Sequence, residues 1–276
     1  SVKALVLGWR RYLARQAAIA EDEGETVFAE FDVNRAVSRL RQDGLYQGLQ
    51  LPDWMVKAIL QYAYQMPCYA NGKPNLGFFY RERDHVASTL ESGLIVGDYF
   101  NTFECEAIRR LVDDSVLLEM ASRYLGGRAV HQGTRLRWSF AIDQTGWDQY
   151  RFNQTYHYDL DDYRAMKFFF YLTDVGEGAG PHICIKGSDQ KKKWTYKLFR
   201  GKHPDDAIES YYGADCIETI YGAPGFGFGE NTECMHKGVT PSAKDRLILI
   251  IEYALKDYGM QHDLVDKGIL RLVAQS

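Results

Sequence analysis

The spacing of apolar residues along this 276-residue chain changes near residue 126. Upstream of that point, apolar residues recur every three or four positions, as they do on one face of a helix. This spacing predicts helices over 33–42, 53–64 and 102–125, and a basic amphipathic pattern predicts another over 1–20. In the longest of these, Asn101 and Glu104 form a capping-box pattern, and Gly126 marks the end.

Downstream of residue 127, apolar residues alternate with polar ones, which is typical of strands. Glycine, proline, aspartate and asparagine separate the alternating runs. The predicted strands cover 136–142, 152–158, 165–172, 182–186, 216–221, 226–229, 234–239 and 247–255. About eight strands of this kind fit two sheets packed face to face. We therefore predict a mainly β fold with flanking helices around a double-stranded β-helix, the jelly roll of cupin-like proteins.

The length of the chain fits one domain, because all-β barrels of this size routinely fold as a single unit. We predict that residues 1–276 form one domain with three parts. A mostly helical part, 1–127, packs on the barrel, 128–256 form the jelly-roll core, and 257–276 extend it at the C-terminus.

A polar segment, 190–213, interrupts the strand pattern and is predicted to be an insertion. Its lysines and arginines are interleaved with aromatic residues, among them Trp194. Long insertions commonly act as lids, so we expect this one to close over the barrel mouth and contact substrate. The basic residues favour an anionic or carrier-linked small molecule, whereas the aromatic ones would equally stack on a sugar or a ring. The sequence leaves open that the lysines only increase solubility.

Composition and charge argue against two classes of partner. Hydrophobic residues make up 46% and the net charge is -4, so the chain has no basic field for nucleic acid. The longest apolar run, 247–255, is too short to span a membrane, and no signal-peptide pattern opens the chain. We therefore expect a cytoplasmic protein.

Five cysteines without a Cys-x-x-Cys pair predict reduced thiols rather than disulfides or a zinc–thiolate site. Nothing in the pattern specifies an oligomeric state.

The strongest chemical signal is His157-x-Asp159 followed far downstream by His236. Residues two apart in a strand face the same side, so His157 and Asp159 can bind one ion together. Two imidazoles and one carboxylate on one face of Fe(II) leave three positions open, as in non-haem iron oxygenases. A second His-x-Asp pair, His203-Pro204-Asp205, lies in the polar insertion without flanking strands, and we interpret it as a chance match.

Arg246 follows His236 by ten residues, at the start of the last predicted strand. A guanidinium binds a carboxylate through two parallel hydrogen bonds, so Arg246 is suited to anchor the distal carboxylate of 2-oxoglutarate. Two alternatives remain open at this point. The same three ligands could hold zinc in a hydrolase or isomerase, which would need no such anchor. The jelly roll could also be a non-catalytic module that binds a glycan or a lipid.

The chain resembles the phytanoyl-CoA dioxygenase-like family of Fe(II)/2-oxoglutarate-dependent oxygenases. The resemblance covers about 128–256, with a weaker match at 40–44. It rests on these segments: Tyr156 to Asp162, Lys167 to Val175, Gly180-Pro181-His182 with Lys186-Gly187-Ser188, and His236-Lys237-Gly238 through Asp245-Arg246-Leu247. One departure is Asp189, where such proteins often have a histidine that is not a metal ligand.

The resemblance implies that His157, Asp159 and His236 bind Fe(II) and that Arg246 binds 2-oxoglutarate, with O2 as the second cosubstrate. It implies oxidative decarboxylation to succinate and CO2, coupled to hydroxylation of a C–H bond in a natural-product, lipid or glycan pathway. Related halogenases carry a small residue at the position of Asp159, so hydroxylation rather than halogenation is expected. Desaturation, ring closure or epimerisation by the same oxidising species stays open.

Other site residues are weaker candidates. Lys167 and Thr173 share one strand face, and either could donate to a carboxylate of the cosubstrate. Arg137 on a predicted barrel strand and Tyr158 between the metal-binding residues are candidates for substrate contact, with Trp194 as the third.

Glycines at every second position in Gly225-x-Gly227-x-Gly229 are typical of some nucleotide-binding loops, but no predicted helix follows them to hold a phosphate. Tight strand packing explains these glycines better.

Overall fold

The computed structural model describes residues 24–142, 155–159, 165–198, 201, 203–257, 259 and 263–273. The helix predicted over 1–20 lies outside these residues, as do 152–154 of one predicted strand. None of the helices in the described ranges is long and apolar enough to span a membrane.

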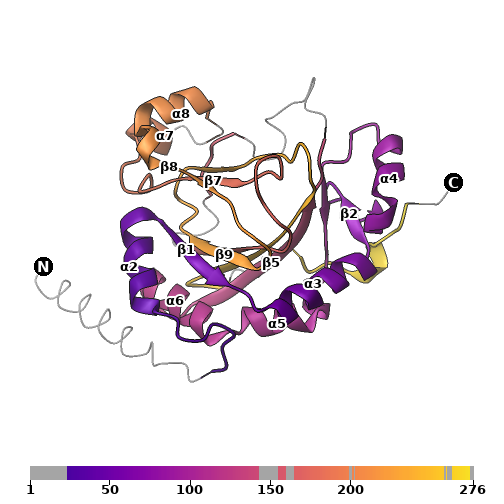
Figure 1. Ribbon diagram of the computed structural model, residues 1–276, viewed down its shortest axis with the longest axis horizontal. Helices are drawn as coiled ribbons and strands as arrows, with labels where there is room; N and C mark the ends of the chain where they lie inside the picture. Colours follow the sequence, from indigo (N-terminus) through magenta and orange to yellow (C-terminus); the bar gives the residue numbers. More distant parts are fainter. Residues whose placement is uncertain are drawn as a thin grey trace, which may run out of the picture.

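Two antiparallel sheets face each other (Figure 1). The large sheet has the order β1-β9-β6-β11-β5-β4-β2-β3, and the small sheet has the order β10-β7-β8. The strands are β1 Leu45–Gln50, β2 Cys68–Ala70, β3 Gly77–Phe78, β4 Val96–Asp98, β5 Val130–Ser139, β6 Ala165–Tyr171, β7 His182–Ile185, β8 Ile217–Ile220, β9 Phe226–Glu230, β10 His236–Gly238 and β11 Arg246–Ala254. An isolated bridge between His157 and His236 adds the segment around His157 to the edge of the small sheet.

The two faces of the large sheet have different neighbours. On β11, Leu247 and Leu249 alternate with Arg246 and Ile248, and only the first pair belongs to the large hydrophobic core under the helices. The second pair lines a pocket between the two sheets. The helices are α2 Val33–Asp43, α3 Asp53–Gln65, α4 Arg83–Thr89, α5 Glu106–Val112, α6 Ser115–Leu125, α7 Trp194–Leu198 and α8 Asp205–Tyr212, with short 3-10 turns at Tyr80–Glu82, Thr102–Glu104, Ala214–Cys216 and Lys267–Ile269. Helices α2, α3, α5 and α6 lie along the outer side of the large sheet, and α7 and α8 lie beyond the small one (Figure 1).

The predicted jelly-roll architecture is confirmed, with strands β6 to β11 at or near the predicted positions. Strand β5 begins at Val130, before the predicted 136–142, and the described part of the predicted strand 152–158 forms isolated bridges at Tyr156 and His157 in place of a strand. The sequence pattern missed β1 to β4, which lie in the part expected to be mostly helical. Strand β1 pairs with β9, and β4 pairs with β5, so this part extends the large sheet at both edges. Short strands such as β2 and β3 are too short to show a two-residue period.

The single helix predicted over 102–125 is wrong. The segment forms a 3-10 turn and two helices, α5 and α6, which meet at Asp113 and Asp114. The Asp114 carboxylate caps α6 by accepting from the amides of Val116 and Leu117, and it also accepts from the amide of Val27. Asn101 adopts a left-handed conformation and makes no side-chain cap, so the predicted capping box is absent there. Gly126 ends α6 in a left-handed conformation, as predicted.

The alternating glycines of β9 reflect tight strand packing, as the sequence suggested. A Cβ atom at Gly227 would lie 2.4 Å from the Phe170 ring on the neighbouring strand β6. We expect Gly227→Ala to lower the free energy of unfolding by about 1–3 kcal/mol, because the buried ring must shift. The measurement is urea denaturation. Gly176→Ala is the matched control, since nothing lies within 4 Å of a Cβ there, and its effect should stay within about 0.5 kcal/mol.

Candidate metal centre

The structure brings His157, Asp159 and His236 together, although His236 lies far from the other two in sequence. The backbones of His157 and His236 bond to each other in both directions, with N···O distances of 3.0 and 2.8 Å. The amide of Asp159 donates to the carbonyl of Thr232 over 2.8 Å. These bonds fix the two segments side by side, so the spacing of the three side chains is set by the sheet.

One ligand atom from each of the three residues lies within 4.8 Å of the others. The Nε2 atoms of His157 and His236 are 3.8 and 3.7 Å from the two carboxylate oxygens of Asp159. Among the described residues, this is the one group of three such side chains close enough to share a metal ion.

Backbone carbonyls select the tautomer of both imidazoles. Nδ1 of His157 lies 2.9 Å from the carbonyl of Thr155, and Nδ1 of His236 lies 2.9 Å from the carbonyl of Cys234. A carbonyl only accepts, so each Nδ1 carries the proton and each Nε2 keeps its lone pair. Both lone pairs belong to the atoms nearest Asp159. This outer hydrogen bonding is what a metal-binding imidazole requires.

Burial and the neighbouring Lys167 determine which side chains of the site are charged. Burial lowers the pKa of His236 to about 4, so the ring is neutral near pH 7. Burial also works to raise the pKa of Asp159, but attraction to His236 and Lys167 holds it well below its ordinary value. Because His236 is neutral near pH 7, the ammonium of Lys167, at 2.8 Å from Asp159, is what stabilises the carboxylate there.

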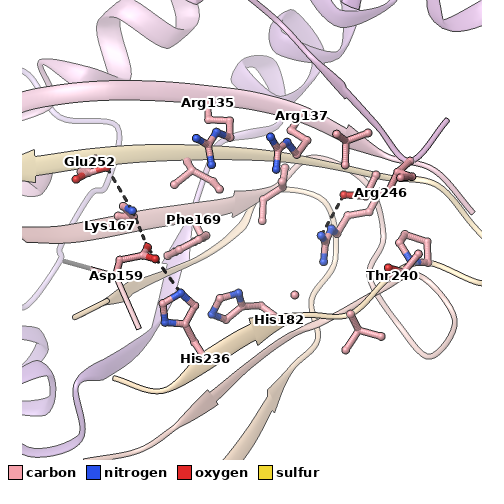
Figure 2. Close-up of a pocket in the computed structure, with 18 of the residues that line it drawn as sticks. Arg135, Arg137, Asp159, Lys167, Phe169, His182, His236, Thr240, Arg246 and Glu252 are labelled. Atoms are coloured by element: carbon pink, nitrogen blue, oxygen red, sulfur yellow. Dashed lines mark hydrogen bonds and ion pairs between the residues drawn. The ribbon is translucent and has the colours of Figure 1, made fainter. Parts of the chain in front are cut away.

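A pocket of about 430 Å³ opens between the sheets beside these residues (Figure 2). Arg246 reaches it from the start of β11 and is 8% exposed. Its guanidinium donates to the carbonyl of Gly180 and, over 3.2 Å, to the hydroxyl of Ser139. Its buried Nε has no hydrogen-bond partner in the described part of the chain. The geometry thus leaves one donor of a buried cation unsatisfied by the described residues.

The other candidate residues occupy different places. Lys167 faces the pocket and bridges Asp159 and Glu252, with the Nζ atom 3.4 Å from Glu252. Arg137 also lines the pocket, where both its Nε and Nη2 bond the carboxylate of Asp98 on β4. The hydroxyl of Thr173 instead accepts from the amide of Leu247 at the end of the sheet. Thr173 is not among the residues that line the pocket.

The insertion packs on the outer face of the small sheet. Ile208 on α8 is buried in a cluster with Tyr156, Ile185 and Met235. Trp194 on α7 is 66% exposed, and no described residue of 190–213 lines the pocket. The lid expected over the mouth is therefore not formed by these residues. The Tyr158 hydroxyl donates to the carbonyl of Tyr196, which ties the insertion to the segment that carries the metal-binding residues.

The chance reading of His203-Pro204-Asp205 agrees with the structure. The amide of His203 donates to the carbonyl of Tyr156, and the carboxylate of Asp205 pairs with Lys237. These contacts attach the insertion to residues that flank His157 and His236.

A buried pair that no sequence pattern indicated, His182 and Glu230, lies behind the candidate metal ligands. Nε2 of His182 lies 2.6 Å from Glu230, whose other oxygen is 3.4 Å from Nδ1 of His236. Burial raises the pKa of Glu230 to about 7, and burial together with the charge of Arg246 lowers the pKa of His182 to about 3. His182 is thus a neutral residue of the pocket wall, and its ring lies tilted against the rings of Phe169 and Phe228.

No protein-family model matches this chain, and no curated protein matches its sequence. Many solved structures share the fold. SnoN, a non-haem α-ketoglutarate-dependent epimerase of nogalamycin biosynthesis solved with Fe3+, α-ketoglutarate and nogalamycin RO, aligns with a TM-score of 0.55 at 14% identity, over 80% of this chain and 82% of that one.

HygX from Streptomyces hygroscopicus, solved with nickel, 2-oxoglutarate and hygromycin B, has a TM-score of 0.53 at 13% identity, over 80% and 86% of the two chains. AviO1 from Streptomyces viridochromogenes Tue57 has a TM-score of 0.51 at 16% identity, over 82% and 96%. At these identities the likeness establishes the fold. The assignment to the phytanoyl-CoA dioxygenase-like family stays a prediction.

Proposed function

We propose that this chain is an Fe(II)- and 2-oxoglutarate-dependent oxygenase that hydroxylates an unactivated C–H bond of a small molecule. The main observation behind the proposal is that two Nε2 lone pairs and one carboxylate lie close together beside a pocket that contains a buried arginine. This donor set fits Fe(II), which two imidazoles and a carboxylate bind on one face. The ligands bound in the structures of SnoN and HygX, which share the fold, support the same choice of metal and cosubstrate.

His157, Asp159 and His236 would hold the iron. When bound, Fe(II) and 2-oxoglutarate supply O2 activation with release of succinate and CO2. The chain's own task is to fix the donors, and the carbonyls of Thr155 and Cys234 do this by holding each imidazole in one tautomer. Asp159 fills the third protein position with a carboxylate, which supports hydroxylation over halogenation.

Arg246 would bind the distal carboxylate of 2-oxoglutarate. Its charge is buried, its carbonyl and hydroxyl contacts fix its orientation, and its Nε lacks a partner in the described part of the chain. A bidentate carboxylate satisfies this unmet donor. The same feature argues against a hydrolytic zinc site, which needs no second anchor in the pocket.

Apolar side chains on the floor of the pocket would hold the substrate and exclude water. Phe169, Ile248 and Ile250 lie on neighbouring strands of the same face. Nogalamycin RO and hygromycin B, the molecules bound to SnoN and HygX, support a small-molecule substrate for this chain too. Epimerisation is a second candidate, because SnoN is an epimerase. Product analysis separates the two, since hydroxylation adds an oxygen atom and epimerisation does not.

The test is anaerobic addition of Fe(II) and 2-oxoglutarate to metal-free protein. We expect the weak visible charge-transfer absorption of an iron–2-oxoglutarate chelate, followed by succinate release when air is admitted. Iron bound without this absorption, and without succinate, would rule the proposal out.

A further inference from the structure

Two arginines on the same face of β5 differ in their partners. Arg137 is held by a bidentate ion pair with Asp98, with distances of 2.6 and 2.8 Å. Arg135, two residues earlier, also lines the pocket, and its side chain is exposed to solvent there. It has no hydrogen bond or ion pair with any other described residue. Figure 2 shows the two guanidinium groups side by side, both projecting into the pocket.

Among the charged residues that the structure describes around the pocket, Arg135 is the unbalanced one. Lys167 lies between Asp159 and Glu252, Arg137 pairs with Asp98, and Arg246 is assigned to the cosubstrate. The two negative charges of 2-oxoglutarate would offset the two positive charges of Fe(II). Repulsion from Arg137 is the largest effect on the pKa of Arg135 and lowers it, and the carboxylates of Asp98, Asp159 and Glu252 offset this repulsion only in part. An anion bound here would remove that repulsion.

The sheet register places Arg135 away from the proposed cosubstrate anchor and from the strand that carries Lys167. In the sheet, Arg135 pairs with Ile250, and Ile250 pairs with Phe169. Arg135 therefore lies two strand spacings, about 10 Å between backbones, from the strand that carries Lys167. Arg246 pairs with Ser139 at the far end of β5. Between Arg135 and the metal-binding side, Ile248 and Ile250 form an apolar floor.

We propose that the substrate carries an oxyanion, a carboxylate or a phosphate, which Arg135 binds while the apolar body lies over Ile248 and Ile250. This inference rests on the proposed function, because it assigns the substrate end of the same pocket. The guanidinium of Arg137, which Asp98 keeps in place, adds positive potential beside the bound oxyanion. The guanidinium of Arg135 offers a planar pair of donors that matches either oxyanion.

The experiment uses protein loaded with Ni(II) and 2-oxoglutarate, since nickel allows binding to be followed without turnover. Inorganic phosphate and acetate are titrated separately by calorimetry, and the anion that binds more tightly identifies the class. We expect saturable binding of at least one anion. Arg135→Gln should weaken that binding about tenfold or more, because a charge-assisted hydrogen bond is lost. Arg39→Gln, at an exposed arginine of α2, should change it less than about twofold.

Three outcomes would overturn the inference. The first is that the wild type and Arg135→Gln bind the anions equally well. The second is that neither anion binds to the wild type below about 10 mM, and the third is that the anion displaces 2-oxoglutarate. The affinity for 2-oxoglutarate is measured first in both proteins. A wild type that fails to bind 2-oxoglutarate with metal contradicts the proposed function, and the anion titrations of the metal-free protein then still decide the role of Arg135.

Discussion

Asp159→Ala is expected to abolish turnover and to weaken Fe(II) binding on the order of 100-fold or more, since it removes one of three donors. Asp159 is the only anionic member of the donor set, so the loss includes the charge that attracts the cation. The fold should survive, because the amide of residue 159 still bonds Thr232 and Lys167 still pairs with Glu252. The measurements are iron affinity of the purified variant and succinate release.

Two comparisons make this result specific. Asp206→Ala removes an exposed carboxylate from the first turn of α8, and it should leave iron affinity within about twofold of wild type. His203→Gln alters the chance His-x-Asp pair and should also retain iron. If His203→Gln loses iron while Asp159→Ala keeps it, the metal centre has been placed on the wrong motif. A variant that loses iron yet binds its small molecule unchanged would favour the non-catalytic binding module.

The core strands could be predicted because each has two different sides. On β6, Phe168 and Phe170 pack under the helices while Lys167 and Phe169 face the pocket. The strand is a short apolar run that contains one polar residue, a pattern from which a strand can be predicted. Strand β4 pairs with the long strand β5, β2 pairs with β4, and β3 pairs with β2, so these short strands depend on neighbours far away in sequence, and their own sequences hold no such signal. The break between α5 and α6 depends on Asp114 meeting Thr26 and Val27, a contact far apart in sequence.

The approach of His157 and Asp159 to each other was predictable for a related reason. His157 and Asp159 are two apart in an extended segment, so their common side follows from backbone geometry alone. The pair of His182 and Glu230 and the difference between Arg135 and Arg137 were not predictable, because each depends on which strands lie side by side. Asp98 lies opposite Arg137 through the pairing of β4 with β5, and nothing local to either residue indicates it.

Arg246→Lys is expected to weaken 2-oxoglutarate binding by about 10- to 100-fold while iron binding stays within about twofold of wild type. Lysine keeps the charge, but a compact ammonium cannot bond the carbonyl of Gly180, the hydroxyl of Ser139 and a carboxylate in one plane. The measurement is titration of 2-oxoglutarate into anaerobic, iron-loaded protein, followed by the visible absorption of the chelate.

Arg135→Lys is the matched control, since it makes the same substitution on the same pocket wall. Because Arg135 lies on the substrate side, this variant should bind 2-oxoglutarate as the wild type does. If Arg135→Lys loses the cosubstrate and Arg246→Lys retains it, the two ends of the pocket have been assigned in reverse. If both variants bind it normally, neither arginine is the anchor, and the argument from the unpartnered Nε of Arg246 fails.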